Sequence, residues 1–284
     1  MNKKVKTATL SVFSNTFLII LKLSVGLITH SVSIISEAIH SAMDLAAAII
    51  AFFSVRMSDD PPDKRHPYGH GKIENISGVI EAILIFIAAI WIIYEAVHKI
   101  TAGGTVESLG LGSLVMLISA AVNTFVSARL YKVARETDSL ALEADALHLK
   151  TDIYTSLGVG VGLGLIWITR LYFLDPVVAM LVALLIIRES YSLLKKAFTP
   201  LLDTALDDND LETIRKTLHE LSLHAHEIRT RKAGNYKFVD MHLEMDPKVP
   251  LAEVHKTCDI LEESLKSRIS YLDVNIHVEP RDKD

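Results

Sequence analysis

The sequence has a single cysteine, Cys258, among its 284 residues, so the chain cannot form an internal disulfide. Because Cys258 lies in a polar segment, we place that segment in a reducing compartment. Positive charge is not in excess either: 29 Lys and Arg stand against 34 Asp and Glu, a net charge of -5. This balance gives no indication of a nucleic-acid partner.

Apolar residues, by contrast, are abundant: they make up 50% of the chain, and the mean hydropathy is +0.33. A membrane-spanning helix needs about 20 mostly apolar residues. Six stretches meet that length: roughly 8–29, 32–55, 77–98, 109–130, 143–169 and 174–193. The sequence therefore predicts an all-α, six-helix transmembrane bundle in residues 1–199.

The positions of lysine and arginine predict how this bundle is oriented. Most of the Lys and Arg residues that flank the predicted spans fall on one side of the membrane, and the turns on the opposite side carry only Lys99 and Arg170. We therefore expect both termini to lie in the cytoplasm. With no organellar targeting segment evident, we expect a multi-pass protein of the cell membrane. The basic residues that fall on one side are Lys3, Lys4, Lys6, Arg56, Lys64, Arg65, Lys72, Arg129, Lys132, Arg135, Arg188, Lys195 and Lys196.

Four glycines, Gly158, Gly160, Gly162 and Gly164, fall in the fifth predicted span. A dinucleotide-binding loop would need a preceding strand and a following soluble helix, and the sequence predicts neither. Small residues spaced by four instead favour close packing between helices in lipid.

After about residue 200 the composition becomes that of a soluble domain, which we place at 200–284. DDNDLETIRKTLHEL and LAEVHKTCDILEESLKSR have helical periodicity. HEIRTRKAG and KFVDMHLEMD alternate like two strands around a turn at Gly234 and Asn235, and LDVNIHVE reads as a third strand. The order α-β-β-α-β predicts a small α+β domain with helices on one face of its sheet.

Two spans contain histidine and aspartate at the same spacing: His40 with Asp44, and His148 with Asp152. Residues four apart share one face of a helix. The alternative is that each pair is satisfied by hydrogen bonds at a helix interface. Ionisable residues inside spans are costly, however, and indicate an ion path. Two matched pairs can supply four ligands, which suits tetrahedral zinc.

A second candidate site lies in PPDKRHPYGHGKIE, after the second span. Asp63, His66 and His70 can converge if the Pro- and Gly-containing segment folds back. The alternative is a solvated polar loop.

A third group of candidate ligands is spread over the soluble segment. His277 and Glu279 are two residues apart and so lie on the same side of a strand. The alternative interpretation is that these histidines are exposed and bind no metal. We treat Glu220, His224 and Glu227 as surface residues. The candidate ligands are His226, His242, His255, His277 and Glu279.

Several segments of the chain match one known family: SEAIHSAMD, PPDKRHPYGHGKIE, ADALHLKTD, and LLDTALDD leading into HEIRTRKAG…MHLEMD…NIHVE. By these segments the chain resembles the cation diffusion facilitator family of divalent-metal/proton antiporters, of the bacterial zinc/iron efflux type. The resemblance covers essentially the whole chain. It implies six spans, a cytoplasmic metallochaperone-like domain and a homodimer.

The resemblance also implies roles for individual residues. His40, Asp44, His148 and Asp152 match the transport site, and Asp63, His66 and His70 match a loop site found in some zinc-transporting members. His226, His242, His255 and His277 match a binuclear cytoplasmic site, where Glu279 stands in place of the family's usual Asp. Lys72 and Asp203 match a membrane-proximal charge pair that links the two halves of the dimer.

The resemblance also bears on metal identity, since the position of His40 is Asp in some bacterial relatives. The His version resembles zinc-selective members, and imidazole favours zinc over manganese. We expect proton-coupled efflux of Zn²⁺ by alternating access, with Cd²⁺, Fe²⁺, Co²⁺ or Mn²⁺ as alternative substrates.

Two other classes of function stay as rivals: an intramembrane zinc hydrolase and a metal sensor that does not transport. A hydrolase needs an open coordination position and a general base. Four protein ligands leave little room for water. The HExxH motif is also absent, since HEIRT has no second histidine at the required position. We therefore do not expect an enzyme.

Overall fold

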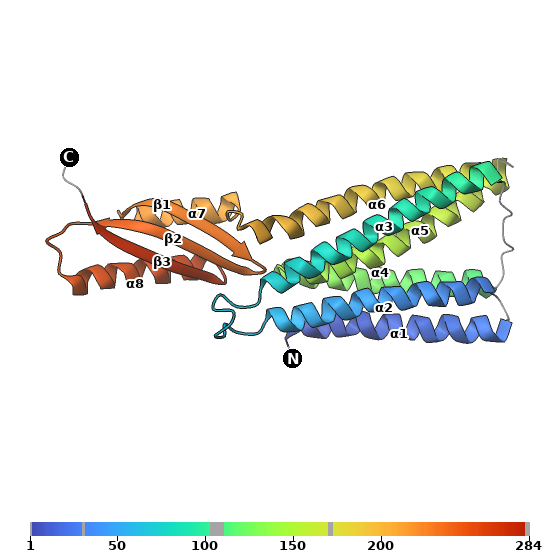
Figure 1. The fold of residues 1–284 in the computed structure, drawn as a ribbon, viewed down its shortest axis with the longest axis horizontal. Coiled ribbons are helices and arrows are strands. Elements are labelled where there is room, and N and C mark those ends of the chain that lie inside the picture. Colours follow the sequence, from blue (N-terminus) through green and yellow to red (C-terminus); the bar gives the residue numbers. More distant parts are fainter. Residues whose placement is uncertain (1, 30–31, 103–110, 170–172, 282–284) are drawn as a thin grey trace. The chain divides into compact units, whose positions relative to one another are not determined.

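The computed structural model describes residues 2–29, 32–102, 111–169 and 173–281 (Figure 1). The chain divides into two compact units, Met1–Phe198 and Thr199–Asp284. The first unit is helical and the second combines helices with a sheet, as the sequence predicts.

The first unit contains the six predicted helices. Within the described residues, five of them have the length and hydropathy of a membrane span. The exception, α5, begins with a polar segment that carries Glu143, Asp145, Lys150 and Asp152. The helices are α1 (Lys3–Thr29), α2 (Val32–Ser58), α3 (Lys72–Ala102), α4 (Leu111–Thr137), α5 (Leu140–Thr169) and α6 (Leu174–Phe198).

Several helices extend beyond the apolar stretches that predict them. α3 begins at Lys72 rather than near residue 77, and α4 continues to Thr137 rather than ending near residue 130. The reason is that hydropathy locates only the apolar part of a helix. Polar turns such as Lys72–Asn75 continue the same backbone hydrogen bonding.

Small residues let the helices of this unit approach one another closely. Ala82 and Ala89 of α3 are fully buried with Ala144 of α5 in one cluster. Gly158 of α5 lies against α6, where a Cβ atom at residue 158 would come within 2.8 Å of a methyl carbon of Val182. This contact fits the packing interpretation of that glycine.

The second unit has the predicted order of elements. A short 3₁₀ helix (Thr199–Leu202) precedes α7 (Asp208–Glu220), β1 (His224–Ala233), β2 (Tyr236–Met245), α8 (Leu251–Arg268) and β3 (Leu272–Pro280). β2 is the central strand, antiparallel to β1 and parallel to β3. Gly234 and Asn235 form the turn between β1 and β2, and Gly234 has a φ of 62° that suits glycine.

Both helices of the second unit pack on the same face of the sheet. Ile214 of α7 and Leu261 and Leu265 of α8 share one buried cluster with Val239 and Met241 of β2. Alternate residues of a strand point to opposite faces, so the next residues along β2 and β3, including His242 and His277, lie on the other face. The fold is thus an α-helical membrane region followed by a small α+β domain, which confirms the predicted fold class.

Candidate metal centres

The two His/Asp pairs of α2 and α5 come together inside the helical unit. His148 Nε2 lies 3.1 Å from Asp44 Oδ1, and His40 Nε2 lies 3.9 Å from Asp44 Oδ1 and 3.8 Å from Asp152 Oδ1. Ligands placed tetrahedrally at zinc–ligand distances would be about 3.3 Å apart. The ligand atoms of His40, Asp44 and Asp152 therefore have a spacing that suits a dication, and His148 adjoins this group through Asp44.

Burial differs among these four residues. The side chain of Asp44 is buried, those of His148 and Asp152 are partly buried, and that of His40 is 55% exposed. Asn123 of α4 donates a 3.5 Å hydrogen bond to Asp152 Oδ2, a supporting contact that the sequence analysis missed. His40 is therefore the most exposed side chain of the four.

Two further carboxylates lie deep in the same unit and were not predicted. Glu81 of α3 and Asp145 of α5 are fully buried. Ser77 donates to Glu81 Oε1, while Glu81 Oε2, both oxygens of Asp145 and Nδ1 of His148 have no hydrogen-bond partner in the described part of the chain. Buried polar atoms of this kind normally hold an ordered water or ion. The sequence signal for Asp145 was its place one turn before His148.

The loop between α2 and α3 folds back as its Pro and Gly content predicts. Asp63 Oδ1 accepts the backbone N–H groups of Arg65 (2.7 Å) and His66 (2.6 Å), and Gly69 has a φ of 80°. These two hydrogen bonds lower the pKa of Asp63 below its ordinary value, and the bond from the His66 N–H has the larger effect. His66 Nδ1 and His70 Nε2 each lie 3.6 Å from an Asp63 oxygen, so the three predicted ligands converge.

Three histidines form one row across the exposed face of the sheet. His226 pairs with His242 across β1 and β2, and His242 pairs with His277 across β2 and β3. Glu279 links the first two, since its oxygens lie 2.8 Å from His226 Nε2 and 3.3 Å from His242 Nδ1. His226, His242 and Glu279 thus offer ligand atoms at metal-binding spacing. The ring of His277 lies 4.8 Å from that of His242.

Glu244 is the residue of this face that the sequence analysis missed. Its Oε1 lies 3.3 Å from His226 Nδ1. The available signal was its position two residues after His242 on β2. Glu227, treated as a surface residue, occupies a β-bulge with a φ of 46° and lies 4.0 Å from His242 Nε2.

His255 lies apart from this row within one chain. It is on α8, 77% exposed, with Nε2 3.7 Å from Asp259. Lys72 and Asp203 belong to different units, so the predicted charge pair stays a prediction. Glu220, also treated as surface, forms a 2.6 Å ion pair with Arg268.

The chain matches two described domain families along nearly its full length. Residues 8–202 match the "Cation efflux transmembrane domain", and residues 206–281 match the "Cation efflux protein, cytoplasmic domain".

Curated relatives match over similar lengths. The chain is 32% identical to "Uncharacterized transporter sll1263" of Synechocystis sp., over 92% of this chain and 85% of the relative. It is 31% identical to "Cation-efflux pump FieF" of Pectobacterium atrosepticum, over 89% of this chain and 84% of that pump. A solved structure titled "Mode of Action of a Putative Zinc Transporter CzrB" is 36% identical, covering 27% of this chain and 99% of that chain, with a TM-score of 0.26.

Proposed function

Because this chain belongs to the cation diffusion facilitator family, we propose that it exports Zn²⁺ from the cytoplasm in exchange for protons, by alternating access. The family assignment supports the general part of this proposal, which is a multi-pass membrane protein for efflux of divalent metal cations. The observation that carries the finer part is the convergence of His40, Asp44, His148 and Asp152 between α2 and α5.

The donor set supports zinc as substrate. Two imidazole nitrogens and two carboxylates form a set that zinc accepts in tetrahedral geometry. Manganese and magnesium prefer oxygen-only sets. Cd²⁺, Fe²⁺ and Co²⁺ remain alternative substrates of the same carrier.

Coupling to protons follows from the ligands. A histidine must lose its proton to bind metal, so loading the site releases protons. Histidine titrates near neutral pH, which makes the exchange reversible. In the proposed cycle the group binds Zn²⁺ from the cytoplasm. Protons then return to His40, His148 or the carboxylates when the site opens outward, and they displace the metal. The inward proton gradient drives efflux.

The second unit is proposed to be a cytoplasmic metal-binding and dimerisation domain (200–284), with the transmembrane domain at 1–199 and both termini in the cytoplasm of the cell. Metal at the row of sheet histidines would stabilise one arrangement of the homodimer only if it binds that arrangement more tightly. Lys72 and Asp203 are proposed to link the two halves.

The test is zinc flux into proteoliposomes that hold the full chain and an imposed pH gradient. Wild-type protein should carry Zn²⁺ against protons, and His40→Ala and Asp152→Ala should abolish the flux. His98→Ala, an exposed histidine of α3, is the matched control and should transport normally. Unchanged flux in both site variants would refute the proposal.

Two rival functions give different results in the same preparation. Zinc binding without any flux in wild-type protein would favour a metal sensor. Zinc-dependent hydrolysis of a peptide or ester, lost in Asp152→Ala, would favour a hydrolase.

A further inference from the structure

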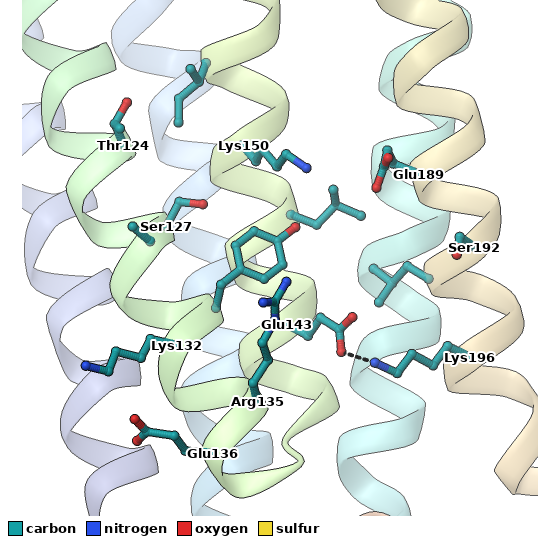
Figure 2. Close-up of a pocket in the computed structure, with 15 residues that line it drawn as sticks. Thr124, Ser127, Lys132, Arg135, Glu136, Glu143, Lys150, Glu189, Ser192 and Lys196 are labelled. Carbon is teal, nitrogen blue, oxygen red and sulfur yellow. Dashed lines mark hydrogen bonds and ion pairs between the residues drawn. The ribbon is translucent and has the colours of Figure 1, made fainter. Parts of the chain in front are cut away.

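The helical unit has a polar pocket on a side of α5 that the metal ligands do not use. A cavity of about 820 Å³ lies between α4 and α5 on one side and α6 on the other (Figure 2). Its lining on α4 and α6 belongs to two helices that are long and apolar enough to cross a membrane, and it lies toward their basic ends. Cavities of this size hold small organic ligands. An occupant of the pocket would therefore lie where the predicted apolar stretches of α4 and α6 end.

The charges in the pocket favour an anion. Arg135, Lys150 and Lys196 extend into it, and they face two carboxylates, Glu143 and Glu189 (Figure 2). Lys196 and Glu143 neutralise each other in a 2.5 Å ion pair. Lys132 and Glu136 also line the pocket and carry opposite charges. What remains is Arg135 and Lys150 against Glu189, an excess of one positive charge.

Arg135 and Lys150 have donors to offer. Within the described residues neither forms a salt bridge. The ammonium of Lys150 instead lies 5.7 Å from the ring of Tyr131 and 5.2 Å from that of Tyr154. Arginine suits the planar, two-oxygen recognition of a phosphate group.

Both cations lie in the halves of α4 and α5 that adjoin the connection between these helices. Arg135 is two residues from the end of α4 and Lys150 is ten residues from the start of α5, or about 3 Å and 15 Å along the helices. Leu147, Ile153 and Leu193 line the same pocket and provide an apolar wall beside the charges. Basic pockets between membrane helices bind phospholipid headgroups.

We propose that this pocket binds one anionic phospholipid, with its phosphodiester on Arg135 and Lys150 and an acyl chain along Leu147 and Leu193. The single negative charge of a phosphatidylglycerol headgroup balances the excess positive charge. The site is separate from the metal ligands and does not depend on which metal the protein carries.

The experiment titrates phosphatidylglycerol onto purified, delipidated full-length protein and counts bound lipids by native mass spectrometry. Wild-type protein should bind one phosphatidylglycerol per chain in preference to phosphatidylcholine and phosphatidylethanolamine. Arg135→Gln/Lys150→Gln should weaken that binding on the order of 30-fold, the effect of two lost cations.

Matched variants separate the pocket from general charge. Arg129→Gln/Arg188→Gln removes two exposed cations of α4 and α6 outside the pocket and should bind lipid like wild type. Arg135→Lys/Lys150→Arg keeps both charges and should also keep the lipid. Zinc binding in each sample reports whether the helical unit is folded.

Four results would overturn the proposal. Equal loss in the control pair would mean a non-specific surface effect. Displacement by millimolar inorganic phosphate would mean a site for a free anion. Equal binding of phosphatidylethanolamine would remove the charge argument. Retained lipid with an altered dimer in the pocket variant would mean that a second copy covers the pocket.

Discussion

Nε2 of His148 lies 3.1 Å from Oδ1 of Asp44, although 104 residues separate them in the sequence. The contact joins one member of each His/Asp pair across α2 and α5. A ligand pair on a single helix is held by that helix alone, whereas this cross-pair contact depends on how α2 and α5 pack. The group can therefore open or close when the two helices move relative to each other.

His40 should decide which metal the group prefers. In His40→Asp an oxygen ligand replaces an imidazole, so Zn²⁺ should lose affinity relative to Mn²⁺. We expect a change of at least about tenfold, since loss of even an outer-shell partner costs that much. Isothermal titration of Zn²⁺, Cd²⁺, Fe²⁺ and Mn²⁺ against both proteins measures it. His98→Asp makes the same chemical change away from the group and should leave the ratio unchanged; a constant ratio in His40→Asp would contradict the prediction.

Glu74 should be one of the most important residues for stability in the helical unit. It is 1% exposed, forms a 3.0 Å ion pair with Lys4, and accepts hydrogen bonds from Ser58 (2.7 Å) and Ser139 (2.5 Å). Lys4 is 3% exposed and, among the residues that the structure describes, keeps only Asp59 as an ion-pair partner when Glu74 is lost.

Glu74→Ala should therefore lower the free energy of unfolding by about 3–5 kcal/mol, as for other broken buried ion pairs. Unfolding in mixed micelles with increasing SDS measures this energy. Glu95→Ala removes an exposed carboxylate from the same helix and should have little effect. Similar losses in the two variants would show that burial of the network does not matter.

The contrast between His40–Asp44 and Glu74 marks what the sequence could predict. A spacing of four places two ligands on one helix face without knowledge of any other helix. The contacts of Glu74 join residues 4, 58, 74 and 139, and no local period connects those positions. The row of His226, His242 and His277 is an intermediate case: each strand could be predicted, but their alignment depends on strand register and on the bulge at Glu227.

Gly158 should be required for the contact between α5 and α6. In Gly158→Ala the new Cβ would come within 2.8 Å of Val182, so one helix must shift. Overpacking of this kind costs about 1–3 kcal/mol. The same SDS titration measures the loss. Val182→Ala removes the clashing methyls, so the double variant should recover part of the stability lost in Gly158→Ala. No recovery would place the cause elsewhere.

The link between Glu220 of α7 and Arg268 of α8 should depend on pH. The hydrogen bond from Arg268 lowers the pKa of Glu220 below its ordinary value of 4.5. A lowered folded-state pKa means that the stabilisation is fully present above pH 4.5 and is lost as the pH falls through the folded value.

Thermal unfolding of wild type and Glu220→Gln from pH 7 to pH 3 tests this. The variant should have a slightly lower melting temperature at pH 7, because the pair is solvent-exposed. The difference should vanish at the acidic end. Glu263→Gln, an exposed carboxylate of α8, should show no such convergence. A difference in melting temperature between wild type and Glu220→Gln that grows as the pH falls would contradict the prediction.

The sheet histidines should bind metal unequally. His242 lies between His226 and His277 and shares Glu279 with His226, whereas His255 is on α8 and apart from the row within one chain. In a background with His40→Ala, Asp152→Ala, His66→Ala and His70→Ala, which removes the transmembrane group and the loop group, His242→Ala should lower the remaining zinc affinity at least about tenfold.

His255→Ala in that background should leave binding to His226, His242 and Glu279 intact. It should remove at most a second ion that needs a ligand from the partner subunit. Zinc titration of the full-length protein, with stoichiometry counted by native mass spectrometry, distinguishes the two effects. If His255→Ala removed the tighter ion as completely as His242→Ala, the prediction would be wrong. His226, His242 and Glu279 of one chain would then not be sufficient to bind zinc. Since His255 is exposed, the dimer would then have to bring α8 of one subunit against the sheet of the other.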